Sequence, residues 1–242
     1  MRKEIISYLS IFLLGVLTGA VFFHPLSESS PGILEGREAE ANIVAVSSLE
    51  DVGVMGKVRV QILPGEGRVL ISTNPFVEPD TQYSAETAVK VASKITGVDF
   101  SDYDIIFDFR INGTVLGGPS AGAAMTVALI AAVENSSVRE DAVITGTIEE
   151  DGKIGEVGGI LEKAQAAAQS GMKLFLLPEG QSQIKYYEKI VKERRVGEIT
   201  FYEIHYVPSY LNLSEYMSSY GLQVVEVSDI REALYYLLEK SG

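Results

Sequence analysis

The stretch Leu116-Gly117-Gly118-Pro119-Ser120-Ala121-Gly122 is the most informative part of the chain. It joins a segment of alternating apolar and polar residues, 103–111, to a run of small and aliphatic residues, 120–133. These patterns predict a strand, a glycine-rich loop and a buried helix. Ser120 would lie at the helix N-terminus, where free backbone N–H groups favour a developing negative charge. The sequence therefore indicates either a nucleophilic serine or an ordinary helix-capping serine.

A serine nucleophile needs a base, and Lys163 is the first candidate. In the predicted helix 159–170 it lies at the edge of the apolar stripe, not on the polar face. A lysine drawn into apolar surroundings has a lowered pKa and acts as a neutral base near neutral pH. The alternative is a surface lysine whose amine reaches water past its apolar stem.

His205 is the second candidate base, in the strand-like segment 201–206. Nothing else in that segment supports a serine–histidine pair, so a structural histidine is the favoured interpretation. His24 is the only other histidine, and the chain has no cysteine. The sequence therefore predicts no cysteine nucleophile, no disulfide, no metal site and no cofactor.

Strands and helices are mixed along the rest of the chain. Strands are predicted at residues 42–48, 56–63, 68–72, 103–111, 142–148, 173–177, 199–207 and 223–227. Helices are predicted at residues 84–96, 120–133, 159–170, 183–195 and 229–240. Because strands come first and helices then alternate with strands, this order predicts an α+β domain over residues 41–242, not a doubly wound sheet.

The N-terminal region has a different composition. Residues 5–23 carry no charge, and a helix of that length spans about 29 Å, close to the hydrocarbon thickness of a bilayer. A cleaved signal peptide is the alternative, but the run is long and no small-residue cleavage site follows it. We predict a single transmembrane helix at residues 1–24 and a linker rich in Pro, Ser, Gly and Glu at residues 25–40.

Charge indicates where the domain lies and what it does not bind. Arg2 and Lys3 precede the apolar run, which predicts a single-pass protein of the cell membrane with an extracytoplasmic domain. The chain holds 20 Lys and Arg against 33 Asp and Glu, a net charge of −13. We therefore expect no nucleic-acid partner, because phosphates would be repelled from most of this surface.

Three motifs, in order, resemble the proteolytic domain of Lon-type serine peptidases. Gly118-Pro119-Ser120-Ala121-Gly122 is similar to the nucleophile motif, and Thr145-Gly146 to the pair that follows the next strand. The segment Gly158-Gly159-Ile160-Leu161-Glu162-Lys163 is similar to the one that carries the base. The spacing of 43 residues from Ser120 to Lys163 also agrees with the family. The resemblance covers residues 42–178 and resumes weakly at 221–240.

The resemblance implies a Lon-like fold with mixed sheets and packed helices, and a serine–lysine dyad. Ser120 would be the nucleophile, Lys163 the general base, and Thr145 a hydrogen-bonding partner within the dyad. The oxyanion and substrate-binding positions would be Gly118, Pro119 and Ala121. The family also implies polypeptide substrates, no cofactor, and a homo-oligomeric ring of six subunits.

The chain departs from the family pattern in three places. It contains no G-x-x-x-x-G-K-[ST] phosphate-binding motif, so ATP would not drive it by itself. Gly117 stands where the family usually has an acidic residue before the nucleophile motif. Residues 181–220 look like an insertion, which would serve as a lid, an oligomer contact, a docking surface or merely a tolerated surface loop.

We therefore expect a membrane-anchored serine endopeptidase that cleaves unfolded or extended polypeptides without ATP. One alternative is a catalytically idle anchored module that binds polypeptide. A second is a protease subunit that depends on a separate ATPase. A third is a hydrolase that pairs Ser120 with His205.

Overall fold

The computed structural model describes residues 34–47, 51–72, 74–113 and 115–239. The chain divides into two compact units, Met1–Glu35 and Gly36–Gly242, and the fold below is that of the second. The predicted transmembrane helix and most of the predicted linker lie outside the described residues. Within the described ranges, no helix combines the length and the apolar character needed to cross a membrane.

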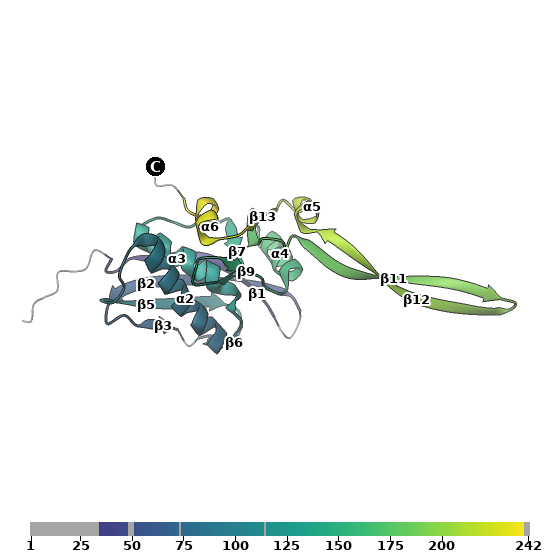
Figure 1. Cartoon of the computed structure of the whole chain (residues 1–242), viewed down its shortest axis with the longest axis horizontal. Helices are drawn as coiled ribbons and strands as arrows, with labels where there is room; N and C mark the ends of the chain where they lie inside the picture. The colour runs from purple at the N-terminus through teal and green to yellow at the C-terminus, as the bar shows by residue number, and fades with distance from the viewer. Residues whose placement is uncertain (1–33, 48–50, 73, 114, 240–242) are drawn as a thin grey trace, which may run out of the picture. The chain divides into compact units, whose positions relative to one another are not determined.

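A four-stranded sheet, in the order β1-β2-β5-β3, forms one layer of the domain (Figure 1). Its strands are β1 (Glu38–Val46), β2 (Gly53–Pro64), β5 (Tyr103–Ile111) and β3 (Val69–Ile71). β1 and β5 each pair antiparallel with β2, and β3 pairs parallel with β5. In β2 the alternate residues Val58, Val60 and Ile62 are fully buried, as the period of two predicts.

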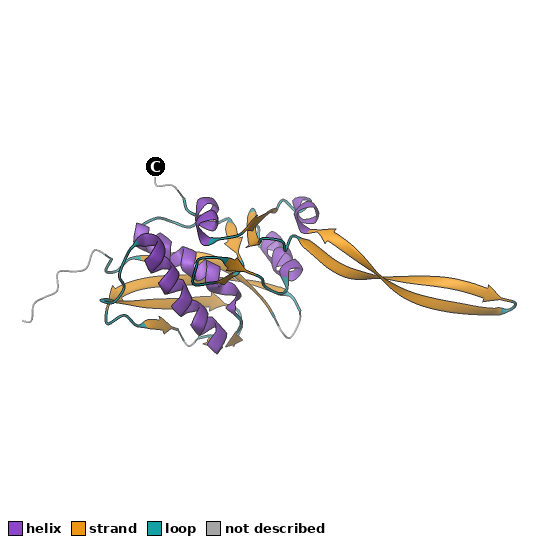
Figure 2. Cartoon of the chain, viewed as in Figure 1, coloured by secondary structure: helices purple, strands orange, loops and turns teal. Residues whose placement is uncertain are grey.

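Two helices lie over one face of this sheet (Figure 2). α3 (Gly122–Glu134) packs against β1 and β2, and α2 (Pro79–Thr96) packs against α3. Residues 122–133 of α3 are all buried, so this helix has no polar face. A helix that is apolar on every side is stable only between other elements, and α3 is therefore the centre of the core.

A second, three-stranded parallel sheet has the order β13-β10-β7. Its strands are β13 (Gln223–Val227), β10 (Leu174–Pro178) and β7 (Ala142–Ile144). All five residues of β10 are buried, which is typical of a central parallel strand. The helices nearby are α4 (Ile160–Gln169), α5 (Leu213–Ser218) and α6 (Ile230–Leu237). The two sheets and their helices confirm the predicted α+β class.

Short pairs of strands complete the domain at its corners. They are β4 (Phe76–Val77) with β6 (Val115–Leu116), and β8 (Thr147–Ile148) with β9 (Ile154–Gly155). The single strand predicted at residues 142–148 is thus interrupted at Thr145 and Gly146, between β7 and β8. The chain turns at this interruption, beside the loop that precedes α3.

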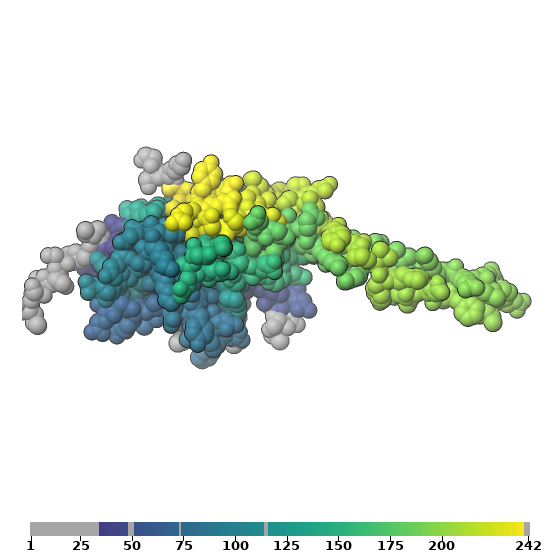
Figure 3. Space-filling model, in the orientation of Figure 1, coloured from purple at the N-terminus to yellow at the C-terminus, as the bar shows by residue number. Residues whose placement is uncertain are grey.

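The helix predicted at residues 183–195 is wrong. β11 (Gln183–Val196) pairs antiparallel along its whole length with β12 (Ile199–Asn212), and Gly197 lies in the turn with φ of +64°. Tyrosines and β-branched residues favour a strand here, and the charged residues that suggested a helical face are spread over both faces of the ribbon. This hairpin extends away from the rest of the domain (Figure 3).

Asn42 forms a polar link between the two sheets. It lies on β1 with 8% of its surface exposed, and its side-chain amide donates to the carbonyl oxygens of Glu140 (2.9 Å) and Ala142 (2.8 Å). These carbonyls belong to the chain entering β7. The two bonds hold β7 beside β1 and satisfy carbonyl oxygens that would otherwise lose water without replacement.

We expect Asn42→Ala to lower the free energy of unfolding by about 2 kcal/mol, because it leaves buried carbonyls without a donor. Urea denaturation of both proteins measures the difference. Asn112→Ala, at an exposed position, is the control and should change stability by less than about 0.5 kcal/mol. Equal stability of the Asn42→Ala chain and the parent would contradict this role of the amide.

Candidate active site

A glycine-containing turn places Ser120 directly before the buried helix α3. Gly118 has φ of +82° and ψ of 157°, a conformation open almost only to glycine. The hydroxyl of Thr81 donates to the Gly118 carbonyl (2.9 Å), and that of Ser84 donates to the Pro119 carbonyl (3.4 Å). Helix α2 therefore holds the start of the short 3₁₀ turn Pro119–Ala121, which contains Ser120.

The corner between β7 and β8 holds the other side of this turn. The backbone N–H of Gly146 donates to the carbonyl of Ser120 (3.0 Å), and the N–H of Ala123 donates to the carbonyl of Gly146 (3.1 Å). A Cβ at position 146 would collide with the side chain of Ile154. Glycine at this position therefore lets Ile154 of β9 pack directly against the corner.

Lys163 is buried on α4, with 3% of its surface exposed. Its Nζ donates to the hydroxyl of Thr145 at 3.1 Å, and Thr145 is fully buried. The side chain of Lys163, at the edge of the apolar stripe of its helix, is therefore buried in the domain and does not reach the surface. Burial lowers the pKa of the Lys163 amine from its ordinary value to about 8, because the charged form loses its hydration. A large share of the amine is then neutral in mildly alkaline solution.

Ser120 and Lys163 line one cavity of about 730 Å³. Gly117, Gly118 and Pro119 also line it, whereas Ala121 does not contribute to its described wall. The fold thus brings Ser120 and Lys163, separated by 43 residues, to a shared space with Thr145 beside the amine. A hydroxyl and a partly neutral amine beside one cavity are two of the groups that nucleophilic catalysis by serine uses.

His205 lies elsewhere. It is on β12 of the hairpin, about half exposed, with Nε2 3.5 Å from the carboxylate of Glu203. It does not belong to the described lining of the cavity that holds Ser120. The structure therefore does not bring Ser120 and His205 together.

Several residues that shape the site have no signal in the sequence. The side chain of Gln181 exchanges two hydrogen bonds, both 3.0 Å long, with the backbone N–H and C=O of Val157. It fixes the segment that leads into α4 and Lys163. The carboxylate of Glu78 occupies the space beside Gly117 where a side chain would begin. Such contacts depend on chain segments that meet only in the fold, so spacing along the sequence does not reveal them.

Among the described residues, no group of three or more His, Asp or Glu side chains is placed to hold a metal ion. Carboxylates do line the cavity that holds Ser120, at Asp51, Glu156 and Glu162, and each comes from a different segment.

The lowered pKa of Lys163 predicts a specific dependence of stability on pH. In the unfolded chain the amine stays protonated to a higher pH than in the folded chain, so the unfolded state binds more protons between about pH 8 and 10. The parent should gain up to about 3 kcal/mol of stability relative to Lys163→Met as the pH rises through that range.

Denaturant titrations of the parent and of Lys163→Met at several pH values measure this difference. Lys173→Met, at an exposed lysine, is the matched control for loss of a positive charge. A difference between the parent and Lys163→Met that stays constant with pH would show that the amine is not desolvated.

The chain is similar in sequence to known proteins over the region that forms this site. The family described as Lon protease (S16) C-terminal proteolytic domain matches residues 42–209. Lon protease of Phenylobacterium zucineum is 38% identical over 119 residues, which cover 48% of this chain and 15% of that protein. Lon protease 1 of Myxococcus xanthus is 29% identical over 173 residues, 68% of this chain and 21% of that protein.

Lon protease of Erwinia amylovora is 25% identical over 200 residues, which cover 81% of this chain and 25% of that protein. The chain therefore corresponds to no more than about a quarter of the length of these relatives. Because the family match spans most of the chain and includes the Ser120, Thr145 and Lys163 motifs, the resemblance seen in the sequence is confirmed. The chain belongs to the Lon protease (S16) C-terminal proteolytic domain family, whose members are serine endopeptidases.

Proposed function

We propose that this chain hydrolyses peptide bonds in unfolded or extended polypeptides through a dyad of Ser120 and Lys163. The observation that carries the proposal is the buried Lys163 amine, bonded to Thr145, in the wall of the cavity that Ser120 also lines. An amine with a pKa of about 8 accepts a proton from serine far more readily than an ordinary lysine does near neutral pH.

In the proposed reaction, Ser120 Oγ attacks the peptide carbonyl and its proton passes to Lys163 Nζ. The same proton then moves to the leaving amine as the C–N bond breaks and an acyl-serine forms. A water molecule next gives a proton to Lys163 and attacks the ester. When the ester bond breaks, that proton returns to Ser120 and the carboxyl product leaves. Each group therefore ends the cycle in its starting protonation state.

Thr145 would keep the Lys163 amine in place by accepting one of its hydrogen bonds, 3.1 Å long. The first N–H groups of the turn at Ser120 and Ala121 have no partner within that turn and would stabilise the oxyanion. Pro119 has no N–H and cannot donate. Pro119 and Gly118 would then shape the wall against which the substrate backbone lies.

We expect the full chain to cleave casein without ATP, and Ser120→Ala or Lys163→Ala to lower kcat/KM by about a thousandfold or more. The pH profile of the parent should rise with a midpoint near pH 8, because only the neutral amine accepts the serine proton. Appearance of new N-termini, with the chain held in mild detergent, measures the rate.

Lys173→Ala is the control for general loss of a lysine, and it should cleave casein as the parent does. Cleavage that survives Ser120→Ala would rule out the proposed nucleophile. A parent without activity would support the alternative of an idle polypeptide-binding module. Activity that appears only when a separate ATPase and ATP are added would support the other alternative.

We further propose that the peptidase is anchored in the cell membrane by residues 1–24 and that its domain faces away from the cytoplasm. The uncharged run at 5–23, preceded by Arg2 and Lys3, supports this. ATP is not available on that side of the membrane, which agrees with the lack of a phosphate-binding loop in these 242 residues.

We propose, finally, that copies of the chain associate in a ring, of six subunits as the family resemblance suggests, and that the hairpin β11–β12 provides a contact. A two-stranded ribbon is only marginally stable in water by itself, and contiguous exposed apolar residues such as those of this hairpin mark contact surfaces. They include Tyr187, Val191, Phe201, Tyr202, Ile204, Tyr206 and Tyr210, each at least half exposed.

Charge supports a second copy as the partner of the hairpin. Residues 183–212 hold five Lys and Arg against four Asp and Glu, whereas the rest of the chain holds 15 against 29. Lys185 pairs with Tyr210 and Lys189 with Tyr206 in the ribbon, so these cations and rings share one face. That face would meet the acidic surface of a neighbouring copy, with the rings supplying apolar contact area.

We expect the double variant Tyr206→Ser/Tyr210→Ser to shift the full chain from a multimer towards the monomer mass. Light scattering coupled to size-exclusion chromatography, corrected for detergent, measures the protein mass. Tyr235→Ser, at an exposed tyrosine on α6, is the matched control and should keep the parent mass. A monomeric parent would refute the oligomer, and an unchanged mass of the double variant would refute the hairpin contact.

A further inference from the structure

We propose that three unpaired carboxylates make the catalytic cavity selective for polypeptide segments that carry lysine or arginine close to the cleaved bond. The proposal rests on the proposed peptidase function and names the substrate class that the same site takes. It assigns specificity to Asp51, Glu156 and Glu162, none of which takes part in the proposed proton transfers.

The three carboxylates converge from separate parts of the chain. Asp51 lies in the connection between β1 and β2, Glu156 follows β9, and Glu162 is in the first turn of α4. All three line the cavity that Ser120 lines. Of the described residues in that lining, only Lys163 is also charged, and it is buried with its amine bonded to Thr145. The cavity therefore presents negative charge to a substrate.

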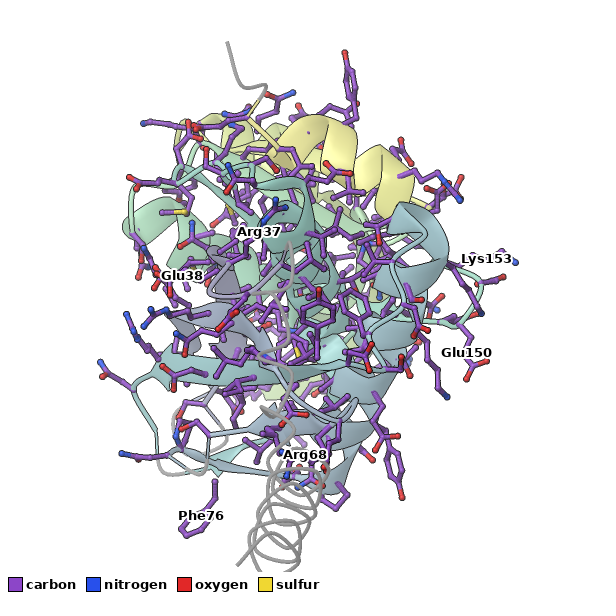
Figure 4. The ribbon with its side chains drawn as sticks, turned by 90° about the vertical axis from the view of Figure 1, so that its left-hand side faces the viewer. Arg37, Glu38, Arg68, Phe76, Glu150 and Lys153 are labelled. Atoms are coloured by element: carbon purple, nitrogen blue, oxygen red, sulfur yellow. The ribbon has the colours of Figure 1, made fainter. Side chains whose placement is uncertain are left out.

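Among the described residues of the lining, Lys163 is the one cation against three carboxylates, so the net charge of the lining is negative. Some acidic residues elsewhere in the domain are paired with basic ones, as in Glu38–Arg59, Asp104–Arg68 and Glu150–Lys90. Figure 4 shows the labelled Glu150 at the outer surface of the domain. None of the ion pairs between described residues contains one of the three cavity carboxylates. A cleft with apolar walls concentrates such an uncompensated field and attracts cations into it.

The shape of the site suits long basic side chains. Val46, Leu116 and Val157 also line the cavity and give apolar walls for the methylene stem of a lysine or arginine. A neighbouring groove of about 420 Å³ shares Glu156 and Glu162 with the cavity and continues to the base of the hairpin. A substrate chain in extended form advances about 3.3 Å per residue, so several of its side chains would pass these carboxylates.

The test uses Asp51 and Glu156, because Glu162 also interacts favourably with the N-terminus of α4 and its loss would disturb the helix. Asp51 has φ of +50°, a conformation that asparagine also adopts readily. The double variant Asp51→Asn/Glu156→Gln therefore removes two charges while it preserves the size and backbone of both residues. Glu134→Gln is the matched control, because Glu134 is exposed at the end of α3 and outside the cavity lining.

The substrates are three peptides built on one mapped casein cleavage site, identical except that Lys, Gln or Glu flanks the cut. We expect the parent to cleave the lysine peptide with a kcat/KM about tenfold above that of the glutamate peptide at low salt, since exposed ion pairs contribute a few-fold each. The difference should lie mainly in KM and shrink as ionic strength rises. In the double variant the ratio should fall several-fold, and in Glu134→Gln it should stay at the parent value.

A second measurement separates this proposal from the peptidase proposal. Binding of the same peptides, labelled with fluorescein, to the Ser120→Ala chain is followed by anisotropy and does not depend on catalysis. Tighter binding of the lysine peptide that is lost with Asp51→Asn/Glu156→Gln supports the selectivity even if the parent cleaves nothing. Equal binding of the lysine and glutamate peptides, or a preference that survives the double variant, overturns it.

Discussion

The burial of one lysine amine is the constraint on which the site depends. Lys163, on α4, is buried away from water. Its amine donates a hydrogen bond to the hydroxyl of Thr145, which follows β7. Without a neighbouring carboxylate bonded to it, the charged form is disfavoured, and the pKa of the amine falls to about 8. An ordinary lysine on the surface is almost fully protonated near neutral pH, so the buried position on α4 is what leaves part of this amine neutral.

Two consecutive residues at one corner of the fold contact both Ser120 and Lys163. Thr145 meets the amine of Lys163, while the backbone of Gly146 bonds to the carbonyl of Ser120. The N–H of Thr145 is in turn bonded to the carbonyl of Leu176 on β10, which ties the corner to the second sheet. Backbone hydrogen bonds therefore fix the corner relative to Ser120 and to β10, and a bond between two side chains joins it to Lys163.

The surface of the domain divides into regions of different chemistry. The cavity that Ser120 lines carries three carboxylates, whereas the hairpin carries exposed tyrosines and aliphatic residues and has five Lys and Arg against four Asp and Glu. Gln181 lies between them, at the base of the hairpin, and holds Val157 in the segment that leads to Lys163. The base of the hairpin is therefore joined directly to the segment that leads to Lys163.

The sequence by itself determined the α+β class, most strands and helices, and the family to which the chain belongs. It could do so because periodicity reports burial, and because the motifs around Ser120, Thr145 and Lys163 have fixed order and spacing. It did not identify β11, where charged residues resembled a helical face although tyrosines and β-branched residues favoured a strand. Only the tertiary structure decided the burial of Lys163, the link through Gln181 and the convergence of Asp51, Glu156 and Glu162. Each depends on segments that are distant in sequence and meet only when the chain has folded.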